Sequence, residues 1–221
     1  MKNNIKNGIE EYYNNINNNS RYKSWEHCYS AFYNAIKNRD KSEEKIDYLC
    51  LHLAFYLASW GMYRGSSFLL EKDYTIHKEP IKKILDAKYS ILSGMQCSSL
   101  LSNIDLLFDL AKELEDEYEK VRSEIKGCVN NNVSETLITK VLLGTLGCVP
   151  AYDRFFKEGL KKFKMKNLSF NKKSIEELCQ YYSKYDKELE KKRKIMNIGK
   201  IKYPQMKLVD MGFWMAGKNN Y

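Results

Sequence analysis

The segment Ser134–Phe156, SETLITKVLLGTLGCVPAYDRFF, carries the clearest structural pattern of the chain. Ser134 is a residue type that caps helices well, and apolar residues then recur every three or four positions. The residues of that apolar face are Ile138, Val141, Leu142 and Thr145. Proline cannot continue a helix. We therefore expect a helix that contains Lys140, is stopped by Pro150, and leaves Asp153 just beyond the break.

Lys140 has a special setting within this helix. Gly144 and Gly147 follow it by four and seven residues, which places them on the same helical face. Glycines leave room beside the lysine for another backbone or a substrate. A lysine whose pKa is lowered by burial can act as a nucleophile. Lys140 and Asp153 are therefore the candidate catalytic residues. The alternatives are that Lys140 extends its ammonium to solvent and that Asp153 only caps the next helix.

The rest of the chain predicts an all-α, multi-helix globular fold, either one compact unit or two helical subdomains. Only 3 prolines and 11 glycines interrupt 221 residues, which favours long helices. One helix is expected to run without a break from Leu100 to Ile125. Others are expected to begin near Ser24, Ser42, Pro80, Ser134, Tyr152 and Ser174 and after Pro204. We divide the chain into an N-terminal helical region, 1–130, and a basic C-terminal helical region, 131–221, which carries the candidate site.

The net charge of +9 is concentrated in the last third of the chain. Residues 154–221 contain 18 Lys and Arg against 7 Asp and Glu, while residues 1–153 contain 19 against 21. A basic block of this kind is typical of a protein that binds phosphate-bearing partners. The alternative is a solvated, lysine-rich surface. The predicted nucleic-acid-binding residues are Arg64, Arg154, Lys157, Lys161, Lys162 and Trp214. Arg64 lies in a segment rich in glycine and serine, where it either binds an anion or pairs with a carboxylate of the chain.

Several classes of protein are disfavoured by the composition. No apolar run of about 18 residues is present, so we expect no membrane span. The first twenty residues lack the apolar core of a signal peptide, and the expected location is cytoplasmic. The six cysteines stand singly and the three histidines lie far apart, so the spacing indicates neither a disulfide framework nor a zinc site. No metal or cofactor is predicted.

Two segments resemble one enzyme superfamily. Residues 149–156, VPAYDRFF, resemble the segment of helix-hairpin-helix DNA glycosylases that carries their catalytic aspartate. Residues 206–217, MKLVDMGFWMAG, are similar to the closing helix of bacterial proteins related to 8-oxoguanine DNA glycosylases. The resemblance covers residues 134–217. It implies that Asp153 is the catalytic aspartate, that Lys140 forms a Schiff base, and that a base flips out of DNA into a pocket.

The leading hypothesis is therefore a DNA-binding protein that acts as a glycosylase/lyase through Lys140 and Asp153. The alternative from a different class is a non-enzymatic helical interaction module, such as a bacterial accessory or phage-defence component. A third hypothesis is a helical ribonuclease that pairs an arginine with a histidine a few residues downstream. In this chain the spacing would single out Arg21 and His27.

Overall fold

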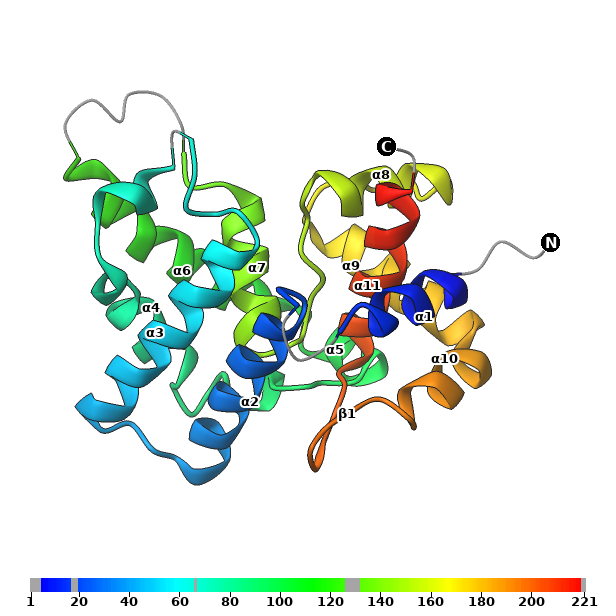
Figure 1. Ribbon diagram of the computed structural model, residues 1–221, viewed down its shortest axis with the longest axis horizontal. Coiled ribbons are helices and arrows are strands. Elements are labelled where there is room, and N and C mark those ends of the chain that lie inside the picture. The colour runs from blue at the N-terminus through cyan, green and yellow to red at the C-terminus, as the bar shows by residue number, and fades with distance from the viewer. Residues whose placement is uncertain (1–4, 17–19, 66, 126–131, 220–221) are drawn as a thin grey trace.

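The computed structural model describes residues 5–16, 20–65, 67–125 and 132–219 (Figure 1). Within these ranges the chain forms eleven α-helices, three short 3-10 helices and one small hairpin, which confirms the predicted all-α fold. The α-helices are α1 (Lys6–Asn14), α2 (Lys23–Asn38), α3 (Glu43–Ser59), α4 (Lys78–Ile84), α5 (Cys97–Ser102), α6 (Ile104–Ser123), α7 (Glu135–Thr145), α8 (Arg154–Lys162), α9 (Lys172–Lys184), α10 (Asp186–Arg193) and α11 (Gln205–Lys218). The 3-10 helices are η1 (Phe68–Glu71), η2 (Tyr74–His77) and η3 (Ser90–Leu92). Strands β1 (Asn197–Ile198) and β2 (Ile201–Lys202) pair antiparallel, with Asn197 opposite Lys202.

Local signals set several helix starts as expected. The side chains of Ser42, Ser134 and Asp153 accept hydrogen bonds from backbone N–H groups of the first turns of α3, α7 and α8. These bonds satisfy donors that have no partner inside the helix. The expected cap at Ser24 is wrong: α2 already begins at Lys23, so Ser24 lies inside its first turn, where its hydroxyl donates to the carbonyl of Arg21 at 2.7 Å.

Two expected helix boundaries are wrong. The continuous helix predicted from Leu100 to Ile125 is divided at Asn103, where the backbone leaves helical geometry with φ −118° and ψ 22°. Helix α7 ends at Thr145, well before Pro150, because Gly147 adopts φ +63°, a conformation that glycine accepts easily. The early end leaves residues 146–153 as a non-helical connector.

The helices form two lobes, seen side by side in Figure 1. The first lobe contains α2, α3, α4, α6 and α7, and the second contains α1, α8, α9, α10 and α11. Helix α5 lies at the lower junction and packs on α9. The membership differs from the two regions drawn from the sequence: α1 packs on α11, and α7 packs on α2, α3 and α6. The connector 146–153 therefore passes from one lobe to the other.

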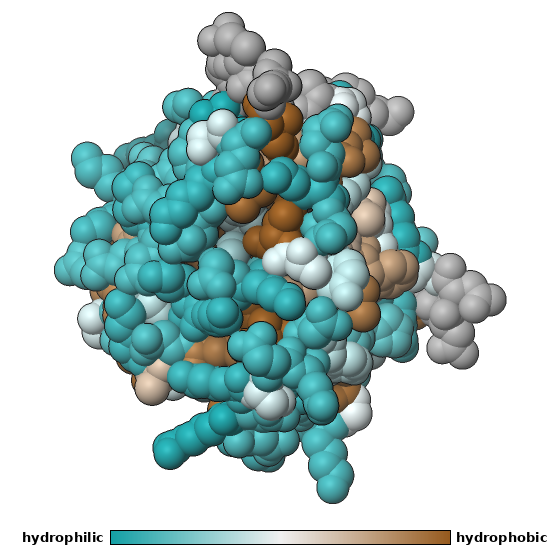
Figure 2. Space-filling view, turned by 90° about the vertical axis from the view of Figure 1, so that its left-hand side faces the viewer, coloured by the Kyte–Doolittle hydropathy of each residue, from teal (hydrophilic) through white to brown (hydrophobic). Residues whose placement is uncertain are grey.

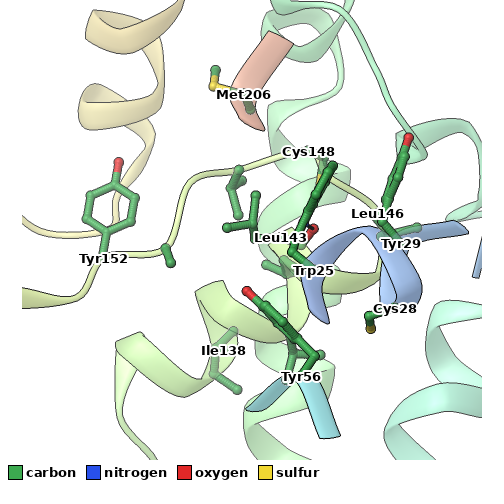
Figure 3. Close-up of a cluster of buried hydrophobic side chains, with 14 of the residues drawn as sticks. Trp25, Cys28, Tyr29, Tyr56, Ile138, Leu143, Leu146, Cys148, Tyr152 and Met206 are labelled. Carbon is green, nitrogen blue, oxygen red and sulfur yellow. Dashed lines mark hydrogen bonds between the residues drawn. The ribbon is translucent and has the colours of Figure 1, made fainter. Parts of the chain in front are cut away.

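This connector is buried along nearly its whole length. Every residue from 137 to 152 is buried. Figure 3 shows Cys148 and its neighbours passing between Tyr56 of the first lobe and Met206 of the second. Side chains satisfy the connector's backbone: the N–H of Ala151 donates to Asp210 at 3.1 Å, and that of Tyr152 donates to Thr139 at 3.0 Å. Because buried backbone groups need partners, these bonds fix the path that leads to Asp153.

Helix α11 approaches its neighbours closely through glycines. A Cβ atom on Gly159 of α8 would overlap the carbonyl oxygen of Phe213, and one on Gly217 would overlap the carbonyl oxygen of Phe155. On its other side, a Cβ on Gly212 would lie 2.5 Å from the side chain of Ile5, which precedes α1. These contacts hold α11 against both α1 and α8, and so place its side chains beside the connector.

The apolar content of the helices bears on a membrane span. In the part of the chain that the structure describes, no helix is both long and apolar enough to cross a bilayer. Figure 2 looks onto the outer side of the first lobe, which is largely hydrophilic with apolar side chains surfacing in small areas.

Candidate functional site

A narrow cavity lies where the two lobes meet. It is lined by Tyr12, Tyr56, Trp60, Lys140, Leu143, Ala151, Asp153, Lys207, Asp210 and Trp214. The first lobe contributes the ends of α3 and α7, and the second contributes α1 and α11. Its volume of about 10 Å³ is close to the smallest that holds one water molecule. A cavity with two lysines, two aspartates and four aromatic rings is unusual because buried charges are costly.

Lys140 and Asp153 meet in this cavity. Lys140 Nζ lies 3.4 Å from Asp153 Oδ2 and donates to the carbonyl oxygen of Trp60 at 2.9 Å. The lysine is only 4 % exposed, so the alternative in which its ammonium extends to solvent is wrong. Burial, the dominant influence, lowers the pKa of Lys140, and the Asp153 charge opposes this shift without cancelling it. The amine therefore loses its proton more easily than an exposed lysine does.

Asp153 uses its two oxygens differently. Oδ1 accepts the N–H of Phe156 at 3.0 Å and caps α8. Oδ2 faces Lys140 and accepts the indole N–H of Trp214 at 3.3 Å. The helix-capping role and the contact with the lysine are therefore present together. The cap holds the second oxygen toward the cavity.

A second ion pair, which the sequence did not single out, lies beside the first. Lys207 Nζ is 2.8 Å from Asp210 Oδ2, and it donates to the hydroxyl of Tyr12 at 3.1 Å. Burial lowers the pKa of Lys207 and raises the pKa of Asp210. The sequence did contain a signal: Lys207, Asp210 and Trp214 share one face of a helix that is otherwise apolar. Charged residues at such spacing indicate a buried polar site.

Aromatic rings from both lobes close the cavity. Tyr12 and Trp60 lie nearly parallel, with an interplanar angle of 4° and ring centroids 6.2 Å apart. The Trp214 ring stands almost perpendicular to both, at 85° to Tyr12 and 86° to Trp60. Sequence reasoning missed Tyr12 and Trp60 as site residues, since the contacts that bring them together are long-range.

The other predicted residues lie outside the cavity. Arg64 is exposed, and its charge makes a minor contribution, after burial, to lowering the pKa of Lys140. On α8, Arg154, Lys161 and Lys162 are exposed, and Lys157 is half-buried in an ion pair with Glu135. Of the predicted set, the structure brings together Lys140, Asp153 and Trp214 and leaves the α8 cations on the surface.

The described residues contain no group of three His, Cys, Asp or Glu side chains placed to hold a metal ion. Comparison of the chain with family models, with curated proteins and with solved structures finds no match.

Proposed function

We propose that this chain is a DNA-binding protein that excises bases as a glycosylase/lyase, with Lys140 as nucleophile and Asp153 as its electrostatic partner. The observation that carries the proposal is the 3.4 Å approach of Lys140 Nζ to Asp153 Oδ2 inside a buried cavity. The pair joins the two lobes at a point where aromatic rings offer stacking surfaces for a base. The basic last third of the chain supplies attraction for DNA phosphates.

The chemistry follows from these two groups. As the bond between sugar C1′ and the base nitrogen breaks, the base leaves with the electron pair and is protonated, and positive charge develops on the sugar. The Asp153 carboxylate stabilises that charge, as carboxylates do in glycoside cleavage generally. The neutral Lys140 amine forms a bond to C1′ and releases a proton. The C1′–O4′ bond then opens, the O4′ oxygen takes a proton, and the lysine is left as a Schiff base.

One observation favours the non-enzymatic interaction module as a second candidate. Both buried lysines already have carboxylate partners within the chain, and the cavity holds no more than a water molecule. Such a closed arrangement also suits a structural joint between the lobes. An active enzyme must separate the lobes enough to admit a base.

Borohydride trapping decides between the two functions. Wild type is mixed with oligonucleotides that carry damaged bases or an abasic site, and is compared with Lys140→Met and Lys140→Arg. The arginine variant keeps the charge beside Asp153 but cannot form the Schiff base. Lys200→Met, an exposed lysine in the hairpin turn, is the control. We expect a covalent adduct in wild type and in the control, and none in either Lys140 variant.

An adduct that survives in both Lys140 variants would remove Lys140 from the mechanism. If wild type forms no adduct and shows no mobility shift with any DNA at low salt, the glycosylase/lyase proposal fails and the non-enzymatic interaction module is the remaining candidate.

A further inference from the structure

Two cations lie against the aromatic rings that close the cavity. The Arg21 guanidinium carbon lies 5.1 Å from the centroid of the Trp60 ring and 5.8 Å from that of Tyr22. Lys218 Nζ lies 5.4 Å from the centroid of Trp214 and 5.9 Å from that of Tyr22, whose hydroxyl accepts its hydrogen bond at 3.2 Å. Arg21 and Lys218, which come from opposite ends of the sequence, therefore lie near the same ring, that of Tyr22.

Arg64 is a third cation near the same place. It follows Trp60 closely in sequence, its side chain folds back to within van der Waals reach of Gly61, and its charge acts on Lys140. Neither Arg21, Arg64 nor Lys218 has a carboxylate within ion-pair distance among residues 5–16, 20–65, 67–125 and 132–219. The alternative in which Arg64 pairs with a carboxylate of the chain is therefore not realised in these ranges.

The absence of a carboxylate partner within the described ranges distinguishes these three residues from other cations there. On α8, Lys157 pairs with Glu135 and Lys161 pairs with Glu158. Three like charges gathered near one aromatic cluster repel one another unless an anion lies between them. The guanidinium of Arg21 lies over the Trp60 ring, and its planar set of N–H donors matches the geometry of phosphate oxygens.

The distribution of charge determines how a ligand is oriented in the cavity. Inside the cavity, Asp153 and Asp210 neutralise the two lysines and would repel an anion. Outside it, Arg21 lies over the ring of Trp60 and Lys218 over the ring of Trp214, two residues that line the cavity, and the charge of Arg64 acts on Lys140. The three cations therefore make this border of the cavity, here called its rim, positive. A ligand with a flat ring and a phosphate therefore fits with its ring toward Trp60 and Trp214 and its phosphate at the rim.

We propose that Arg21, Arg64 and Lys218 form a phosphate clamp for the nucleotide whose base enters the cavity. Arg21 and Arg64 belong to the first lobe and Lys218 to the second, so a bound phosphate holds the lobes together across the cavity mouth. The identification of this nucleotide as part of DNA rests on the proposed function. Recognition of the phosphate itself requires no catalysis and is tested separately.

The first experiment titrates the protein with deoxyguanosine monophosphate and with deoxyguanosine and follows tryptophan fluorescence. We expect the nucleotide to bind at least about tenfold more tightly than the nucleoside, the size of one charge-assisted contact. Arg21→Gln and Lys218→Gln should each reduce that preference severalfold. The matched control is Arg39→Gln. Arg39 is an exposed arginine that directly follows the far end of α2, whereas Arg21 lies just before the start of that helix.

The clamp is overturned if nucleotide and nucleoside bind equally, if neither binds, or if Arg39→Gln weakens binding as much as Arg21→Gln does. A second measurement uses DNA. Each variant of the clamp should lower the slope of log affinity against log salt by about 0.7 to 0.9, the contribution of one phosphate contact, and Arg39→Gln should not.

The two proposals fail in different ways. If wild type prefers the nucleotide but forms no borohydride adduct, the phosphate clamp stands and the proposed glycosylase/lyase activity is contradicted. If wild type forms the adduct but the clamp variants keep the full salt slope and the full nucleotide preference, the proposed activity stands and the clamp is contradicted.

Discussion

At the scale of single residues, Asp153 combines a structural and a chemical contact in one carboxylate. Asparagine also caps helices well, whereas alanine does not. Asp153→Asn should therefore keep the start of α8 while it removes the charge beside Lys140, and Asp153→Ala should remove both. We expect the alanine variant to be less stable than the asparagine variant by about 1 kcal/mol in urea unfolding. Both should lose most adduct formation in borohydride trapping.

Equal stability of the two variants would show that the cap contributes nothing measurable. Full adduct formation in Asp153→Asn would show that the negative charge is not needed for the chemistry.

His77 is expected to make stability depend on pH. It is fully buried, with Tyr63 Oη at 2.8 Å from Nε2 and Tyr118 Oη at 2.7 Å from Nδ1. Burial lowers its pKa from 6.5 to about 3. The unfolded chain therefore takes up a proton below about pH 6.5 that the folded chain refuses until about pH 3. Stability from this group is complete above pH 6.5 and is lost as the pH falls, by at most about 1.4 kcal/mol per pH unit.

Denaturant unfolding between pH 7 and pH 4 measures this slope. His77→Gln should flatten it, although the variant will start from lower stability. His27→Gln, which changes an exposed histidine of α2, should leave the slope as it is in wild type. The assignment to His77 is wrong if the His77 variant keeps the wild-type slope.

At the scale of elements, the crossing of α8 and α11 depends on glycine. Gly159→Ala would place a Cβ atom onto the carbonyl of Phe213, so the helices must move apart. Overpacking of this kind costs about 1 to 3 kcal/mol. The shift should also draw Trp214 away from Asp153 and reduce adduct formation. Unfolding free energy and the trapping assay measure the two effects.

Gly199→Ala, in the turn of the β1–β2 hairpin, is the control for the Gly159 variant. Gly199 has a φ of +59° but no atom within 4 Å of an added Cβ, so its variant reports backbone strain alone. That strain costs about 1 kcal/mol and should not affect adduct formation. A Gly159 variant that is as stable and as active as wild type would mean that α8 and α11 can separate freely.

The same elements show what sequence reasoning can and cannot reach. Caps such as Ser42, Ser134 and Asp153 act on their own first turn, so local pattern was enough to predict them. The approach of Lys140 to Asp153 could be predicted in part from the sequence, because only a short connector separates the two residues. The early end of α7 was not predicted, since it depends on Gly147 taking a left-handed conformation against Pro204 and Tyr29.

The site as a whole was beyond sequence reasoning. Tyr12 and Lys207, whose side chains are hydrogen-bonded, are 195 residues apart in the sequence. Helices α1 and α11 lie in one lobe only because Gly8 and Gly212 permit close contact, and amphipathic periodicity does not specify such pairings. The sequence predicted three of the ten residues that line the cavity, Lys140, Asp153 and Trp214, and the packing of the helices supplied the others.

At the scale of the whole molecule, the buried run 137–152 joins the lobes into one cooperative unit. Its backbone bonds to Asp210 of the second lobe and its side chains pack into the first. We therefore expect one unfolding transition, with tryptophan fluorescence and far-ultraviolet circular dichroism changing together in urea. Trp25 lies within the first lobe, whereas the rings of Trp60 and Trp214 meet between the lobes, so the fluorescence follows the first lobe and the junction together. Two separate transitions would mean that the lobes fold independently.

The position of Tyr12 in the cavity has a consequence for biosynthesis. Helix α1 leaves the ribosome long before α11, and at 5 to 20 residues per second the partner Lys207 follows Tyr12 by roughly 10 to 40 s. For that interval Ile5, Ile9 and Tyr12 have no apolar surface of α11 to cover them. The nascent chain therefore exposes the apolar face of α1, to which chaperones or neighbouring polypeptides can bind. The cavity closes only after α11 has been synthesised.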